Sequence, residues 1–113
     1  MVRRMLAVGG SILICVGLGV GVASGQKGKG DAAKGKEVFD SQQCSMCHNV
    51  DVPDKKMGPS LQHLFQHKAL QNGKAVNEAN VLAQINNGGN GMPPYDSLSA
   101  TDKANLLAYL HSL

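Results

Sequence analysis

The pattern of apolar and polar residues predicts helices from about position 31 to the C-terminus. Apolar residues recur there at spacings of three and four, the period of an α-helix that buries one face. The last predicted helix follows Ser99, which forms with Asp102 the S-x-x-[DE] capping box of a helix start. Its apolar face consists of Leu106, Leu107, Tyr109 and Leu110.

Shorter helices are predicted before it, over residues 32–42, 60–67 and 78–86. Asp31 and Asn77 carry side chains that can cap the first and the third of them. No segment shows the strict alternation of a strand, so the sequence predicts an all-α domain of four or five short helices. The apolar positions expected to face the core are Gly35, Val38, Phe39, Leu61, Leu64, Phe65, Val81, Leu82 and Ile85.

The N-terminal segment differs in composition from the rest. Residues 1–24 begin with the basic pair Arg3 and Arg4, continue with an apolar run over 6–23 and end in small residues, which is the layout of a secretory signal peptide. The alternative is an uncleaved membrane anchor formed by 6–23, since the run has about the minimum length that spans a bilayer. Either interpretation predicts a periplasmic or otherwise extracytoplasmic location.

Composition and charge indicate the domain organisation of the chain and limit its possible cofactors and partners. We expect residues 25–30, rich in Gly and Lys, to be a flexible linker and residues 31–113 to be one domain. Aromatic residues make up only 4% of the chain, so a bound cofactor would supply apolar bulk that the core lacks. The formal charge of +3 falls to +1 without Arg3 and Arg4, which argues against nucleic acid as a partner.

The five residues Cys44-Ser45-Met46-Cys47-His48 carry the strongest chemical signal. C-x-x-C-H is the attachment signature of a c-type haem. Two thiols three positions apart on one turn can each bond a vinyl group of the porphyrin, and the adjacent imidazole can then bind the iron. We therefore predict Cys44 and Cys47 as the thioether residues and His48 as an axial ligand.

Two alternatives exist for the same cysteines. Cys44 and Cys47 could form a redox disulfide, although that chemistry normally occurs beside a βαβ unit and no strand is predicted. Their spacing to His63 and His67 also matches a Cys2His2 zinc site. The zinc interpretation leaves His48 and the C-terminal half unexplained, and the intervening prolines and glycine do not suggest a hairpin.

Met92 is the best candidate for a second iron ligand on the opposite face of the haem. Among the other methionines, Met5 lies in the export segment, Met46 lies between the two thiols and Met57 is close to His48 in the chain. Met92 follows a run of glycines and precedes two prolines. Glycines allow the backbone to approach a porphyrin closely, and prolines stiffen the loop behind the thioether.

Several motifs together resemble those of small bacterial class I cytochromes c. The resemblance covers residues 31–113 and implies the cytochrome c fold, in which N-terminal and C-terminal helices cross around one covalently bound haem. It implies that Met92 is the distal ligand and that the carbonyl group of Pro59 accepts the N–H of His48. The shorter loop between His48 and Met92, and the lack of Trp, depart from the mitochondrial members. The motifs are Gly35-x3-Phe39, Cys44-x2-Cys47-His48, Gly58-Pro59-Ser60-Leu61, Gly91-Met92-Pro93-Pro94 and Leu106-x2-Tyr109-Leu110.

The resemblance implies a single-electron carrier and not an enzyme. Its expected partners are a membrane respiratory complex, a terminal oxidase or a periplasmic oxidoreductase, with a membrane involved directly only if the N-terminal segment stays uncleaved. The alternative is a haem sensor or a peroxidase-like enzyme in which Met92 leaves the iron open. Lysines cluster near the start of the domain and at the pair Lys55 and Lys56. They either form ordinary solvent-exposed surface or provide a docking surface for an acidic redox partner.

Overall fold

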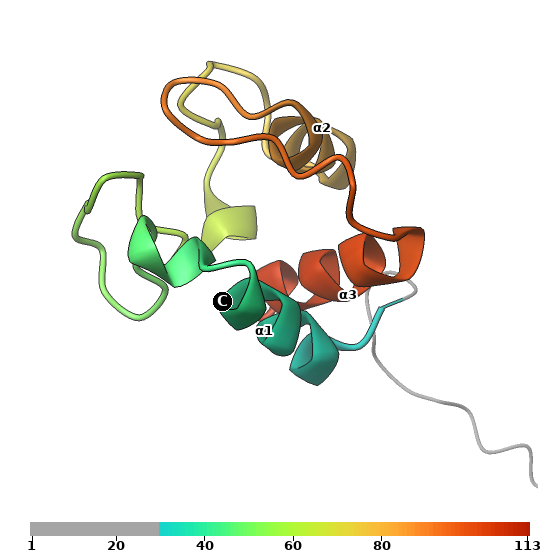
Figure 1. Ribbon diagram of the computed structural model, residues 1–113. Helices are drawn as coiled ribbons and strands as arrows, with labels where there is room; N and C mark the ends of the chain where they lie inside the picture. The colour runs from blue at the N-terminus through green and yellow to red at the C-terminus, as the bar shows by residue number, and fades with distance from the viewer. Residues whose placement is uncertain (1–29) are drawn as a thin grey trace, which may run out of the picture.

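The computed structural model describes residues 30–113, which form three α-helices and two single-turn 3-10 helices (Figure 1). The α-helices are α1 (Ala32–Ser41), α2 (Glu78–Asn87) and α3 (Ala100–His111). The 3-10 helices are η1 (Cys44–Met46) and η2 (Leu64–Gln66). No strand occurs within 30–113, so the predicted all-α class is confirmed.

The predicted capping residues begin all three α-helices. The Asp31 carboxylate accepts hydrogen bonds from two backbone N–H groups of the first turn of α1. Asn77 Oδ1 accepts from Asn80 N at 2.8 Å, and Ser99 Oγ accepts from Asp102 N at 3.0 Å. Each bond satisfies a donor that has no partner within its helix, which explains why the helices start where the sequence predicts.

Helices α1 and α3 cross at a contact between backbones. A Cβ atom added to Gly35 would lie 1.9 Å from the carbonyl oxygen of Asn105, so only glycine allows this approach. Beside the crossing, the rings of Phe39 and Tyr109 lie 5.3 Å apart in a tilted arrangement. The crossing of the first and last helices that the resemblance implies is therefore present.

The buried side chain of Asn105 adds a polar contact at this crossing. Asn105 Oδ1 accepts a hydrogen bond from Asp31 N at 2.8 Å across 74 positions of sequence. Asn105 is the only polar residue among the buried side chains of 30–113, and the sequence analysis did not single it out. A buried amide in a helix interior gives no sequence signal when its partner is a distant backbone group.

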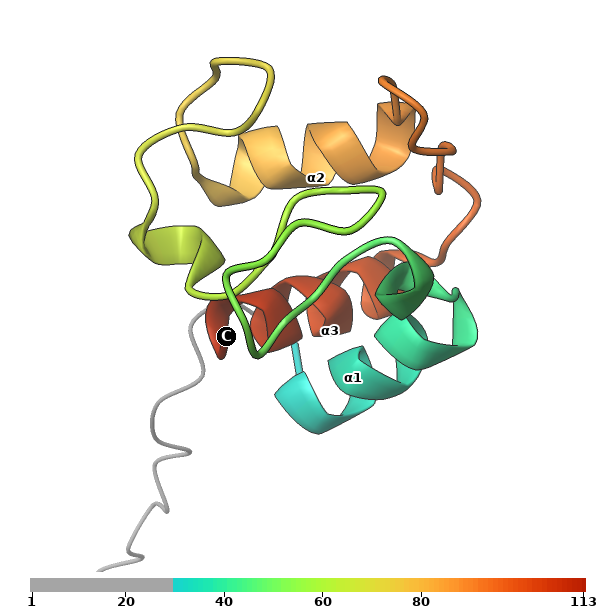
Figure 2. The ribbon, with the colours of Figure 1, turned by 90° about the vertical axis from the view of Figure 1, so that its left-hand side faces the viewer.

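Helix α3 lies between the other two. Figure 2 shows α2 on one side of α3 and α1 on the other, with the chain after α1 passing beside them. One cluster of buried side chains joins these elements, and all of its members were predicted to face the core. They are Phe39, Leu64, Val81, Ile85, Leu106 and Leu110.

The helix predicted over residues 60–67 is wrong in length. The structure has only the single turn η2 there, because neighbouring residues are held by the preceding loop. Leu61 N donates to Asn49 O at 2.8 Å, and Ser60 Oγ donates to the same carbonyl oxygen at 3.4 Å. His63 then adopts a left-handed conformation with φ 53°, which a continuous helix does not allow.

The folded part of the chain includes Gly30, the last residue of the predicted linker. Gly30 is buried, and a Cβ atom there would lie 2.0 Å from the carbonyl oxygen of Ala104. The predicted signal peptide or anchor, 1–24, and the linker residues 25–29 lie outside the described residues. Within 30–113 no helix has the length and apolarity needed to cross a membrane.

Candidate functional site

The two thiols and the imidazole of the C-x-x-C-H motif are carried by one tight turn. Gln43 takes a left-handed conformation with φ 59°, and η1 follows directly. Cys47 N and His48 N both donate to the carbonyl oxygen of Cys44, at 3.2 and 3.0 Å. The turn therefore fixes the backbone that carries both thiols and the imidazole.

Both cysteines of the turn are free thiols in the structure. Each is half-buried, and burial raises the pKa of the Cys44 thiol above its usual value. The redox disulfide, the alternative considered for these two cysteines, is not formed in the structure.

The imidazole of His48 is held by the Gly58–Pro59 segment. Its Nδ1 lies 2.7 Å from the carbonyl oxygen of Pro59, the pair that the resemblance implies. A carbonyl oxygen only accepts, so Nδ1 carries the hydrogen and Nε2 keeps a free lone pair. Gly58 N donates to Cys47 O at 2.8 Å, and a Cβ atom on Gly58 would lie 2.7 Å from the imidazole. The ring thus has a defined tautomer and a defined orientation.

Met92 lies at the end of a tight turn that follows α2. Gly89 and Met92 exchange two backbone hydrogen bonds, of 2.9 and 3.0 Å. The central residues Asn90 and Gly91 both have positive φ, 53° and 88°, which defines a type I′ turn. A Cβ atom on Gly88 would lie 2.3 Å from Met92 O, so the loop closes tightly on itself. The Met92 side chain is half-buried.

The loop of Met92 and the turn of the cysteines share the same interior. Cys44, Met92 and Tyr95 all pack against the one buried cluster that joins the helices. Burial raises the pKa of the Tyr95 hydroxyl, and the nearby Cys44 and Cys47 raise it further. Tyr95 is three positions after Met92, so it brings the end of the methionine loop close to the two thiols.

Two further histidines do not join this site. His63 and His67 are exposed, and His67 Nε2 is within 3.1 Å of the Gln62 carbonyl oxygen. Among residues 30–113 no three His, Cys, Asp or Glu side chains gather to hold a metal ion. The zinc alternative built on Cys44, Cys47, His63 and His67 is therefore wrong.

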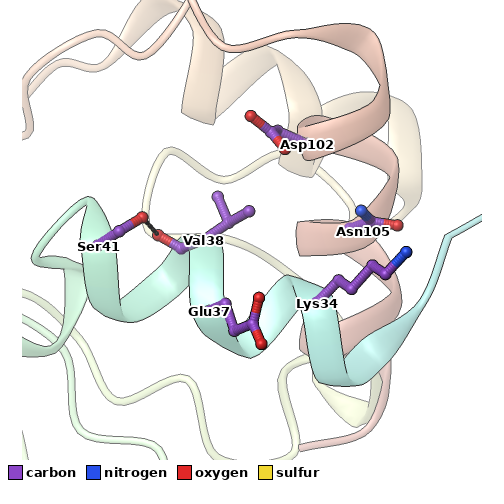
Figure 3. A pocket seen from close by; sticks show the side chains of 6 residues that line it. All are labelled: Lys34, Glu37, Val38, Ser41, Asp102 and Asn105. Carbon is purple, nitrogen blue, oxygen red and sulfur yellow. Dashed lines mark hydrogen bonds between the residues drawn. The ribbon is translucent and has the colours of Figure 1, made fainter.

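An open groove at the crossing of α1 and α3 holds none of the predicted site residues. Figure 3 shows its lining side chains, which project from both helices and carry charges of both signs. They include no thiol, imidazole or thioether, so the chemistry of the chain does not lie here. The lining residues are Lys34, Glu37, Val38, Ser41, Asp102 and Asn105.

The donor set in the interior suits an iron porphyrin bound through two thioether bonds. Cys44 and the half-buried thioether of Met92 pack against one apolar cluster, and the turn that holds Cys44 also carries the second free thiol, Cys47, and the imidazole of His48 with its Nε2 lone pair available. Imidazole and thioether are the axial ligands of a c-type haem whose iron has both positions filled. The sequence analysis missed one contact of this set, since Gln84 Nε2 lies 3.7 Å from the sulfur of Met92.

Comparison with known proteins identifies related sequences. Residues 30–110 match the family described as cytochrome c oxidase, cbb3-type, subunit III. The chain is 31% identical over 87 residues to cytochrome c oxidase subunit 2 of Alkalihalophilus pseudofirmus, a match that covers 73% of the chain and 25% of that protein. The chain therefore spans about a quarter of the length of this relative.

Two solved structures with a similar fold carry the name cytochrome. Cytochrome c6 from the diatom Phaeodactylum tricornutum aligns with a TM-score of 0.54 at 27% identity, over 74% of this chain and 93% of that one. Cytochrome cH from Methylobacterium extorquens aligns with a TM-score of 0.54 at 20% identity, over 74% of this chain and all of that one, and is similar in fold alone.

Proposed function

The chain belongs to the family described as cytochrome c oxidase, cbb3-type, subunit III, has the fold of a small class I cytochrome c, and from this premise we propose that it carries single electrons on one covalently attached haem c. When bound, the haem supplies an iron that alternates between the ferric and ferrous states. The chain's own residues attach it, orient it and shield it from water.

Cys44 and Cys47 are the residues that attach the haem. Each thiol would add across a vinyl group of the haem, with its sulfur bonding one carbon and its hydrogen passing to the other. His48 would hold the iron through Nε2. Pro59 holds the opposite edge of the imidazole, because its carbonyl oxygen accepts from Nδ1 at 2.7 Å. This pairing of a fixed tautomer with two free thiols on one turn is the observation that carries the proposal.

Met92 would hold the iron through its thioether sulfur. Its loop is stiffened by the type I′ turn before it and by Pro93 and Pro94 after it. A thioether is a weak ligand, so a loop with few conformations favours the bound form. If His48 and Met92 both hold the iron, no coordination position would remain for a substrate. The protein then transfers electrons and does no chemistry of its own.

Respiratory redox proteins are the proposed partners. The family and the relative from Alkalihalophilus pseudofirmus both carry the name of a cytochrome c oxidase subunit, which supports an oxidase or another membrane respiratory complex. A periplasmic oxidoreductase is the remaining class. Electron-transfer encounters of this type use small, short-lived interfaces. Export by the segment 1–24 would bring the domain to the compartment of such partners.

The proposal is tested by mass spectrometry of the protein purified from a host that matures c-type cytochromes. The expected mass is that of the chain plus one haem, with pigment that resists extraction by acidified acetone. The variant with Cys44→Ala and Cys47→Ala should lose the covalent pigment, whereas Cys15→Ser, outside the motif, should retain it. A colourless wild-type protein, or pigment that extracts freely, would overturn the proposal.

Carbon monoxide distinguishes a carrier from a haem protein with an open iron. The reduced wild-type protein should not bind carbon monoxide at neutral pH, because both axial positions are occupied. Binding without denaturation would instead favour the sensor or peroxidase-like alternative. The mass from the same preparation also reports where the chain starts, and so whether the N-terminal segment is removed.

A further inference from the structure

Three large apolar side chains of the described domain are exposed to solvent, and all of them lie within residues 44–58. Met57 is 82% exposed, Met46 66% and Val52 38%. The other Leu, Ile, Val, Met and Phe side chains of 30–113 are buried or half-buried. Figure 1 shows the stretch with the three exposed residues, in green, standing out from one side of the molecule. Such a gathering is typical of a contact surface, and we call these three residues the apolar patch.

The two methionines of the apolar patch lie on neighbouring segments of backbone. The N–H group of the residue after Met57 donates to the carbonyl oxygen of Cys47 at 2.8 Å. The amine of Lys56, the residue before Met57, donates to the carbonyl oxygen of Ser45 at 3.1 Å. Both bonds therefore join a residue beside Met57 to a residue beside Met46. The methionines form one exposed pair, although they are distant in the sequence.

The loop 49–58, which carries the other two members of the apolar patch, is held by side chains at its base. Asn49 Nδ2 donates to the carbonyl oxygen of Asp54 at 2.8 Å. Gln62 Nε2 donates to the carbonyl oxygen of Asp51 at 2.9 Å. A surface that is ordered before a partner arrives loses little conformational entropy on binding. The apolar patch is thus presented in a defined shape.

The charges around the apolar patch balance one another. Asp51 and Asp54 oppose Lys55 and Lys56, so the loop carries two carboxylates, two amines and no net charge. All four side chains are exposed, and the amine of Lys56 already donates to a carbonyl oxygen of η1. An acidic partner would meet as many carboxylates as amines. An uncharged apolar face would match both the patch and its balanced surroundings.

We propose that the apolar patch is the docking surface for a redox protein that presents an uncharged, apolar face. The inference rests on the proposed function, because η1 carries both Met46 and Cys44, one of the residues that would attach the haem. The patch therefore lies beside the point of attachment. Methionine is unbranched and polarisable, so it adapts to the irregular surface of a partner. A patch of three side chains is small, which suits an encounter that ends when the electron has passed.

Oxidation of the reduced, haem-loaded protein by a detergent-solubilised cbb3-type cytochrome c oxidase tests the proposal. The variant with Met46→Gln and Met57→Gln keeps the length of both side chains and makes them polar. We expect its KM to rise about tenfold while kcat and the reduction potential stay unchanged, since the side chains lose the hydrophobic gain of burial in the interface. The wild-type KM should change less than about twofold between low and physiological salt, because the charges around the patch balance.

Matched variants make the test specific. The variant with Met46→Leu and Met57→Leu keeps the apolar character and should keep the wild-type KM. Gln66→Ser with Gln71→Ser shortens two exposed side chains outside the apolar patch and should also leave KM unchanged. Met57→Gln alone lies outside the haem-attachment motif and should raise KM about threefold. It serves if a change at Met46 prevents attachment of the haem.

Three results would overturn the docking role of the apolar patch. An unchanged KM in both glutamine variants would show that the partner does not contact the patch. A wild-type KM that rises steeply with salt, together with an equal rise in Lys55→Gln, would assign docking to the lysines and to an acidic partner. A wild-type protein that sediments as a dimer, and as a monomer after Met57→Gln, would show that a second copy of this chain covers the patch.

Ferricyanide, a small inorganic oxidant, separates this inference from the proposed function. A haem-loaded wild-type protein that ferricyanide oxidises and the oxidase does not would overturn the docking role and leave the electron carrier in place. A protein without covalent haem, or one whose haem ferricyanide cannot oxidise, would overturn the proposed function and the docking role with it.

Discussion

Gly35 and Asn105 meet so closely that the first and last helices touch through their backbones. A Cβ atom at Gly35 would lie 1.9 Å from the Asn105 carbonyl oxygen and 2.7 Å from the Cβ of Tyr109. Backbone atoms cannot move aside as the end of a flexible side chain can. The two helices would have to separate to admit even one methyl group.

Gly35→Ala should therefore destabilise the haem-loaded domain by about 3 kcal/mol, the upper range for overpacking, or prevent its folding. Urea denaturation followed by circular dichroism measures the change. Gly73→Ala is the matched control, because a Cβ atom at Gly73 meets nothing within 4 Å. Gly73 has φ 82°, so that control should lose about 1 kcal/mol from its backbone conformation alone. Equal losses in both variants would contradict the close contact.

Met92→Ala should open the iron and lower the reduction potential. Without the thioether, the reduced protein should bind carbon monoxide, which spectroscopy detects directly. Met57→Ala is the control, because Met57 is 82% exposed and packs against nothing in the core. If the Met57→Ala control binds carbon monoxide and Met92→Ala does not, the assignment of Met92 as the iron ligand is contradicted.

Tyr109 should make the stability of the domain decline at alkaline pH. Burial is the main reason that its pKa lies above the usual value of 10.0, with Lys36 opposing and Asp40 and Asp51 adding to the rise. The unfolded chain therefore releases this proton first. The contribution is complete below pH 10.0 and is lost as the pH rises through the higher folded pKa.

Urea denaturation of wild type and Tyr109→Phe between pH 8 and 11 measures this effect. Phenylalanine keeps the ring that packs on Phe39 and removes the ionising hydroxyl. The free energy of unfolding should fall more steeply with pH in the wild type than in the variant. Parallel curves would show that the hydroxyl does not titrate differently in the folded state.

An ion pair joins the start of α2 to the end of α3. His111 Nε2 lies 2.8 Å from Glu78 Oε1, and the imidazole stacks on Phe65 with ring centres 3.6 Å apart. The Glu78 side chain is 49% exposed, so the pair should contribute only about 0.5 kcal/mol.

A double-mutant cycle with Glu78→Gln and His111→Gln isolates that energy. The coupling should shrink in 1 M salt, because screening weakens a pair this exposed. A coupling energy that does not change with salt would show that ring stacking and packing, and not charge attraction, hold the two side chains together. The cycle also removes any separate effect of Glu78 on the start of α2.

Local signals in the sequence predicted most of the fold. Asp31, Asn77 and Ser99 cap helices because their side chains bond to donors two or three residues ahead, and nothing distant intervenes. The segment 60–67 was mispredicted for the opposite reason. Ser60 and Leu61 are held by hydrogen bonds to the loop that contains Asn49, and such contacts leave no trace in a helical period.

The functional site, like the fold, has some features that neighbouring residues determine and others that depend on contacts between residues distant in the sequence. Cys44, Cys47 and His48 are adjacent in the chain, so their spacing alone predicts a shared turn. Gln84 carries no motif and becomes visible only when α2 and the methionine loop are placed together. The role of Pro59 came from family resemblance, because a backbone carbonyl has no side-chain signature.

The hydrogen bond between Asp31 and Asn105 has a consequence for the synthesis of the protein. It spans 74 positions, so almost the whole domain must be synthesised before its two ends can meet. Closing so long a loop is the slow, late event in a chain of this topology. Until α3 arrives, the turn with Cys44 and Cys47 belongs to an open chain. Both thiols are then more accessible than in the folded domain, where each is half-buried.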